Sequence, residues 1–170
     1  MEPVGSREPA FRLTVEANSS KLFDRGLSKA GHKGDSITQS TQDQNKALVL
    51  RAFDLLFNKR DYAAAEKLWS SHYIQHSAHI EPGREGLFNL IKSLPATLQY
   101  EAGVVVAEGD FVIAHGRFSG FGSTVNWIAA DILRIQDGIL VEHWDVIQDE
   151  ATEQQSKSKA PMFGATFPTY

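Results

Sequence analysis

The sequence predicts an α+β domain in which helices precede a strongly curved, mainly antiparallel sheet and cover one of its faces. In the first half of the chain, apolar residues recur at helical spacing between residues 41 and 94. From residue 100 onward, Val, Ile, Phe and Trp occur in short runs separated by turn-forming residues, which is typical of strands. Helices first and strands afterwards is the element order of an α+β fold.

Three helices are expected, and each has recognisable end signals. The first is amphipathic and starts at a capping box that Thr41 and Gln44 would form. A second, short helix over residues 62–69 follows an N-cap at Asp61 and is rich in strong helix formers. A third helix, over residues 87–94, stops before a proline, because a residue that precedes proline is disfavoured in helical conformation.

Four successive antiparallel strands are expected from Tyr100 onward. Turn signals separate them: Glu-Gly-Asp at residues 108–110, a Gly- and Ser-containing stretch at residues 120–123, and Asp-Gly at residues 137–138. No internal repeat is visible, so one domain over residues 43–150 accounts for the helices and the strands.

Both ends of the chain are expected to be tails. Residues 1–42 mix Gly, Ser, Lys, Glu and Gln with scattered apolar residues, a composition that cannot offset the entropy lost on ordering. We therefore expect disorder there; a mitochondrial transit peptide is the alternative, and the acidic residues of the segment disfavour it. Residues 151–170 are expected to form a C-terminal tail.

Composition excludes several kinds of chemistry. The 170 residues contain no cysteine, which rules out disulfides, thiolate nucleophiles and Cys-ligated zinc. The net charge is −4 and no run of Lys or Arg occurs, so neither nucleic acid nor a membrane surface is an expected partner. Apolar runs are far shorter than a membrane span, and a cytoplasmic location is expected.

One carboxylate of the third expected strand lies on an apolar stripe. Strand alternation places Asp131 on the same face as Val125, Trp127, Ala129, Leu133 and Ile135. Desolvation there would raise the pKa of Asp131 toward the range useful for proton transfer at neutral pH. Asp131 is therefore the candidate general acid or base. The alternative is a structural carboxylate bonded to a backbone amide or to a buried Tyr, Trp or His.

A histidine is expected beside this carboxylate. His115 shares a face with Phe111, Ile113 and Arg117, and adjacent antiparallel strands would bring it within reach of Asp131 as an acid/base couple. A satisfied core histidine is the alternative for His115.

The hairpin at residues 137–138 decides which residue of the last strand lies opposite Asp131. A two-residue loop would set Trp144 there, whereas a three-residue loop with a Gly bulge would set His143 there, and both stay open. In either case His143 and Asp145 share a face, and Trp144 points the other way.

Neither a metal nor a cofactor is expected. His72, His76 and His79 have a spacing that zinc ligands can show, but the segment over residues 72–86 is interpreted as a loop with partly exposed histidines. No Gly-rich phosphate-binding loop follows a strand, which disfavours nucleotide cofactors.

Two stretches resemble the SnoaL-like polyketide cyclases of the nuclear transport factor 2-like (NTF2-like) superfamily. They are YIQHSAHIEPGREG at residues 73–86 and ADILRIQDGILVEHWDVIQ at residues 130–148, and the resemblance covers about residues 44–148. It implies a cone-shaped α+β barrel whose bent sheet wraps the long first helix around an apolar pocket, usually in a homodimer formed through the sheet. The family commonly has Asn-Pro where this chain has Ser77-Ala78, so the loop geometry after His76 is expected to differ.

The resemblance also implies a chemistry. Cyclases of this family close a ring by intramolecular aldol condensation without a cofactor, using an aspartate as general acid/base and a nearby histidine. These two residues match Asp131 and His115, whereas Tyr73 and His76 match the Tyr-x-Gln-His signature at the pocket rim. The side chains expected to contact a substrate are Phe53, Tyr73, His76, Trp127, His143 and Trp144.

The expected function is cofactor-free acid/base catalysis on a small hydrophobic carbonyl compound, by aldol-type cyclisation or isomerisation, of the kind found in secondary metabolism. A non-catalytic module that binds a small ligand or dimerises is the alternative. An epoxide hydrolase of the limonene type ranks lower; it would need Arg117 held between Asp131 and Asp145 to activate water.

Overall fold

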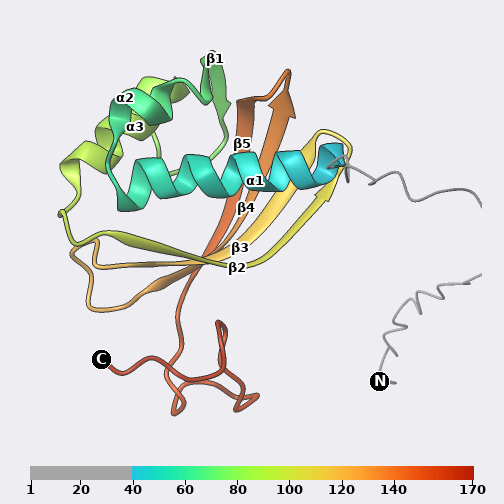
Figure 1. Cartoon of the computed structure of the whole chain (residues 1–170). Helices are drawn as coiled ribbons and strands as arrows, with labels where there is room; N and C mark the ends of the chain where they lie inside the picture. Colours follow the sequence, from blue (N-terminus) through green and yellow to red (C-terminus); the bar gives the residue numbers. More distant parts are fainter. Residues whose placement is uncertain (1–39) are drawn as a thin grey trace, which may run out of the picture. The chain divides into compact units, whose positions relative to one another are not determined.

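A five-stranded sheet and the helices that precede it form the part of the chain that the computed structural model describes, residues 40–170. The long helix α1, Thr41–Phe53, runs across one face of the sheet (Figure 1). The expected N-terminal tail, residues 1–42, lies outside the described residues except for its last three positions.

Those three positions belong to the start of α1. Ser40 is the N-cap, and its Oγ accepts a hydrogen bond from the backbone N–H of Asp43 at 3.2 Å. The expected capping box at Thr41 is therefore wrong by one residue, because Ser40 supplies the capping oxygen and Thr41 is already helical. A single wider π-helical turn, η1, Asp54–Asn58, continues α1 and buries Phe57 against the core.

Two shorter helices follow. Helix α2, Tyr62–Glu66, starts at the expected N-cap, since Asp61 Oδ1 accepts from the Ala64 N–H at 3.0 Å. It ends before the expected residue 69 because Trp69 already belongs to a strand. Helix α3, Gly83–Ser93, ends before Pro95 as expected. It starts directly after Pro82, four residues before the expected start at residue 87.

The four expected antiparallel strands are confirmed, and a fifth strand makes the sheet mixed. Strand β1, Trp69–Gln75, pairs in parallel with β5, so the strand order is β1-β5-β4-β3-β2. The antiparallel strands are β2, Gln99–Glu108; β3, Phe111–Ser119; β4, Trp127–Gln136; and β5, Ile139–Asp149.

Strand β1 corrects the interpretation of residues 72–86 as a loop. A parallel partner is never joined by a short hairpin, so no turn signal near β1 in the sequence points to β5. His72 lies inside β1 and His76 directly follows it, which removes the helical spacing that a zinc site at His72, His76 and His79 would need. The backbone N–H of His76 still donates to the carbonyl oxygen of His143 at 2.9 Å, which extends the pairing past the strand end.

The β4–β5 hairpin follows neither of the two registers considered from the sequence. Its turn has two residues, because Gln136 pairs with Ile139, but the register shifts by one before Arg134 pairs with Glu142. This bulge sets Asp145 directly opposite Asp131. His143 and Asp145 share a face with Asp131, as alternation within β5 predicts.

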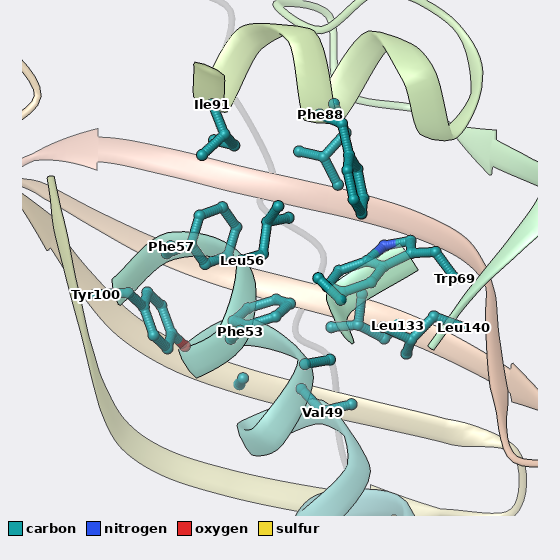
Figure 2. Packing of buried hydrophobic residues seen from close by; sticks show 14 of the residues in the cluster. Val49, Phe53, Leu56, Phe57, Trp69, Phe88, Ile91, Tyr100, Leu133 and Leu140 are labelled. Atoms are coloured by element: carbon teal, nitrogen blue, oxygen red, sulfur yellow. The ribbon is translucent and has the colours of Figure 1, made fainter. Parts of the chain in front are cut away.

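The sheet has an inner face, which packs against α1 and carries Ala114, Asp131 and Leu133, and an outer face, which carries His115 and Val146. The core lies between the inner face and the helices. Figure 2 shows Phe88 and Ile91 of α3 pointing toward Trp69 and Phe57.

Several aromatic rings pack against one another in this core. Phe53 meets both Phe57 and Tyr100 edge-on with ring centroids 5.0 Å apart, and Trp69 meets Phe88 in the same way at 5.6 Å. Gly116 lets Tyr100 lie against β3, since a Cβ there would come within 2.4 Å of the Tyr100 ring and hydroxyl.

The C-terminal segment, residues 151–170, contacts the outer face. The Phe163 ring lies 4.5 Å from the guanidinium of Arg117 and 5.7 Å from the ring of His115. Glu150, which has no exposed side-chain surface, accepts from Arg117 at 2.6 Å and so anchors the start of this segment. None of the helices in residues 40–170 is long and apolar enough to cross a membrane.

Candidate functional site

An apolar cavity of about 80 Å³ lies between the helices and the inner face of the sheet. Three polar side chains, Asp131, His143 and Asp145, share one part of its wall, and no Lys or Arg lines it. Its aromatic lining consists of Phe53, Phe57, Trp69, Tyr73, Phe118, Phe121 and Trp127. The cavity is partly open to solvent, so it admits several waters or one end of a small, largely apolar compound.

Asp131 is a buried carboxylate with one oxygen paired and one oxygen free. Only 4% of its surface is exposed. Its Oδ1 lies 3.1 Å from Nε2 of His143, which is also buried, and its Oδ2 has no hydrogen-bond partner. Burial raises the pKa of Asp131, the charge of Asp145 adds to the rise, and the bond to His143 opposes it.

Gln75 fixes the protonation of the His143 ring. Gln75 Oε1 accepts from the backbone N–H of Ser77 at 3.0 Å, so the Gln75 oxygen, and not its NH₂ group, occupies this position. The same oxygen lies 2.9 Å from His143 Nδ1, which must therefore carry a hydrogen and donate it. In a neutral His143, Nε2 is then left with a lone pair that faces Asp131.

A proton is consequently shared between Asp131 and His143. If the imidazole is neutral, the contact between Asp131 Oδ1 and His143 Nε2 requires a protonated carboxyl group. If the carboxyl group is ionised, the contact requires an imidazolium ion. In both forms the pair holds one transferable proton at the cavity wall, which is the property that a general acid/base needs.

Two further donors lie near this pair. Burial raises the pKa of Tyr73 well above its usual range, and the charges of Asp131 and Asp145 add to the rise, whereas the Trp69 indole opposes it. The Tyr73 hydroxyl is therefore un-ionised at neutral pH and remains a hydrogen-bond donor. Trp69 Nε1 is buried close enough to the Tyr73 hydroxyl to act on its pKa but makes no full hydrogen bond, and the Trp69 ring lines the cavity.

The three polar residues of the cavity wall are also the metal-ligand candidates within the described part of the chain. One ligand atom each from Asp131, His143 and Asp145 lies within 4.8 Å of the others. Two ligands about 2.1 Å from one zinc ion lie at most about 4.2 Å apart, so an ion would have to draw these side chains together. It would also compete with the existing contact between Asp131 and His143.

A family model places the chain among known proteins. The model of the SnoaL-like polyketide cyclases matches residues 47–156, which is more than half of the chain. The chain belongs to the SnoaL-like polyketide cyclase family. A comparison with curated proteins finds no match.

Solved structures show the NTF2-like fold. AclR from Streptomyces galilaeus, a proposed hydroxylase, is 28% identical with a TM-score of 0.53, over 64% of this chain and 91% of that one. A proposed ketosteroid isomerase from Kribbella flavida is 18% identical with a TM-score of 0.56, over 63% and 79%. An NTF2-like protein of unknown function from Cytophaga hutchinsonii is 19% identical with a TM-score of 0.54, over 66% and 94%.

In this SnoaL-like chain the histidine beside Asp131 is His143, and the expectation for His115 is wrong. Residue 115 pairs with Ala130, whereas Ala114 pairs with Asp131, so the His115 side chain lies on the outer face. It contacts the Phe163 ring there. The outer face of β3 carries the apolar Phe111 and Ile113 beside His115, which is why alternation alone did not show which face is inner.

The arrangement required for an epoxide hydrolase is also absent. Arg117 lies on the outer face, where its guanidinium bonds to Glu101 at 3.2 Å and to Glu150 at 2.6 Å. Both carboxylates that it would have to bridge, Asp131 and Asp145, face the cavity on the other side of the sheet. The prediction of an arginine between two aspartates is therefore wrong.

The predicted substrate contacts divide into two groups. Phe53, Tyr73, Trp127 and His143 line the cavity together with Asp131. His76 and Trp144 are not among the lining residues; their rings stack on each other with centroids 4.7 Å apart. His76 also bonds to Glu142 at 2.9 Å.

Two residues of the site were missed as participants, Gln75 and Trp69, and Asp145 was considered only as a partner of Arg117. Gln75 pairs with His143 across β1 and β5, a contact hidden by the failure to expect β1. Trp69 was assigned to a helix. The sequence did place Asp145 on the face of His143, and this shared face was the available signal for its position.

Proposed function

We propose that the chain catalyses proton transfer at a carbon next to the carbonyl group of a small, largely apolar compound, in an aldol-type ring closure or an isomerisation. The observation that carries the proposal is the buried Asp131–His143 pair, which holds one transferable proton at the wall of an apolar cavity. Membership in a family of polyketide cyclases, and a fold similar to that of a proposed ketosteroid isomerase, support this reaction class.

In the proposed first step, Asp131 is the base. Its free Oδ2 takes a proton from the carbon next to the carbonyl, the C–H electron pair forms the C=C bond of an enolate, and negative charge moves to the carbonyl oxygen. The Tyr73 hydroxyl and the Trp69 indole N–H are the donors available to stabilise that oxygen. His143 stabilises the ionised form of Asp131 before the step.

In the second step the proton leaves Asp131 again. In an isomerisation it is delivered to a different carbon of the enolate. In an aldol closure the enolate carbon attacks a second carbonyl of the same molecule, and the proton goes to the alkoxide that forms. The reaction as drawn uses only side chains of this chain, and the apolar walls strengthen its electrostatic interactions by excluding water.

Deuterium uptake tests the proposal without knowledge of the natural substrate. 4-Methylacetophenone has acidic C–H bonds next to its carbonyl, so an enzyme of this kind should speed their exchange in D₂O, followed by NMR. Asp131→Asn should slow the exchange by about 10²-fold or more, the usual contribution of a general base. Asp149→Asn is the control, because Asp149 is exposed and does not line the cavity.

The alternative is a module that binds a small ligand without transforming it. The apolar lining of the cavity is compatible with that role as well. Binding of carbonyl compounds to the wild-type chain, with exchange no faster than in buffer, would favour the binding module and contradict the enzyme.

A further inference from the structure

The polar part of the cavity wall carries an excess negative charge. Asp131 and His143 share one proton and together are neutral, but Asp145 has neither a hydrogen bond nor an ion pair within residues 40–170. No Lys or Arg lines the cavity. The wall therefore presents one uncompensated carboxylate to whatever occupies the cavity.

The position of Asp145 costs the folded chain free energy unless a bound group pairs with its carboxylate. Asp145 is directly opposite Asp131 on an antiparallel strand, and like charges at such positions are destabilising. Asp145 is also partly buried, so water screens it incompletely. Across from it, Asp131 Oδ2 is buried and has no partner, which leaves a second acceptor oxygen available at the same wall.

The remaining walls are suited to a cation. Aromatic rings make up much of the lining, and the faces of Trp, Tyr and Phe attract ammonium groups. Tyr73 lies close enough to both carboxylates for their charges to act on its hydroxyl. An aromatic wall beside an unpaired carboxylate is the combination that binds an amine.

We propose that the compound bound in this cavity carries a protonated amine on its apolar body, and that Asp145 is the group that binds the amine. The inference rests on the proposed function in taking this cavity as the substrate site. It narrows the substrate class to amine-bearing carbonyl compounds and excludes carboxylates and phosphates, which would face Asp145 with no basic side chain among the lining residues to offset the repulsion.

Three probes with one skeleton and different charge test the proposal. They are 4-acetylbenzylamine, 4-methylacetophenone and 4-acetylbenzoate, and their dissociation constants can be measured by ligand-observed NMR. The amine should bind at least about tenfold more tightly than the neutral ketone, and the benzoate most weakly. In Asp145→Asn the preference for the amine should fall to within about threefold, whereas Asp149→Asn should keep it.

The outcomes separate this inference from the proposed function. Equal affinities for the three probes, tightest binding of the benzoate, or no binding of the amine at millimolar concentration would overturn the amine inference. If Asp131-dependent deuterium exchange persists in that case, the proposed function stands. Preference for the amine that depends on Asp145, with no exchange in any probe, would support the amine site and contradict the enzyme.

Discussion

Replacing Gln75 by leucine should change both the stability of the chain and the protonation of His143. Gln75 Oε1 accepts two hydrogen bonds, from the Ser77 N–H at 3.0 Å and from His143 Nδ1 at 2.9 Å. Leucine has a similar size but no acceptor, so both donors lose their partner. Ser77 and His143 are each only 6% exposed, so water replaces the lost oxygen poorly.

The magnitude follows from these two bonds. A buried donor left without an acceptor costs roughly 1–3 kcal/mol. Leucine also removes the Gln75 Nε2 group, which is buried without a partner, so the lower part of that range applies, and the free energy of unfolding should fall by about 1–3 kcal/mol for the two donors together. Gln75→Glu keeps an acceptor oxygen and should recover the Nδ1 contact.

Two measurements check this prediction. Urea denaturation gives the loss of stability, with Gln136→Leu as the control because Gln136 is exposed and outside the cavity. Nitrogen-15 NMR of the His143 ring should show Nδ1 protonated in the wild type, and the hydrogen should move toward Nε2 in Gln75→Leu, where Asp131 is the remaining acceptor. A wild-type ring with an unprotonated Nδ1 would refute the reasoning.

Two further predictions concern stability and assembly. Because burial raises the pKa of Asp131, its contribution to stability is full below its ordinary pKa and is lost as the pH rises through the raised value. The melting temperature of Asp131→Asn, relative to the wild type, should therefore increase as the pH is raised from the ordinary pKa of an aspartate, about 4, and a difference that stays constant over the pH range in which the chain is folded would contradict this. We also expect a homodimer through the outer face, where Val104 and Val146 are 67% and 69% exposed. Val146→Glu should then give monomers in light scattering, and a wild-type chain that is already monomeric would exclude the dimer.

The sequence was most informative within single elements. Strand side chains alternate with a period of two, so the apolar stripe around Asp131 and the shared face of His143 and Asp145 followed from local pattern and were confirmed. The N-cap at Asp61 was likewise readable, because capping depends on a few consecutive residues.

Relations between elements were less predictable. One bulged residue between Leu140 and Glu142 shifted the hairpin register and placed Asp145, instead of His143 or Trp144, opposite Asp131. Parallel pairing joins β1 to a strand about seventy positions away, and no local signal marks such a pair. The bulge decides which residues of β5 lie beside Asp131, whereas the β3–β4 register, in which Ala114 pairs with Asp131, puts His115 on the other face of the sheet, and alternation within one strand shows neither.

Comparing the two histidines tests the central claim most directly, namely that Asp131 works with His143 on the inner face of the sheet. The variants are His143→Phe and His115→Phe, and the measurement is the rate of deuterium uptake by 4-methylacetophenone, or by 4-acetylbenzylamine if that probe binds more tightly. His143→Phe should lose the accelerated exchange, by about 10²-fold, whereas His115→Phe should keep it. Exchange that survives in His143→Phe and disappears in His115→Phe would contradict the assignment of the acid/base pair.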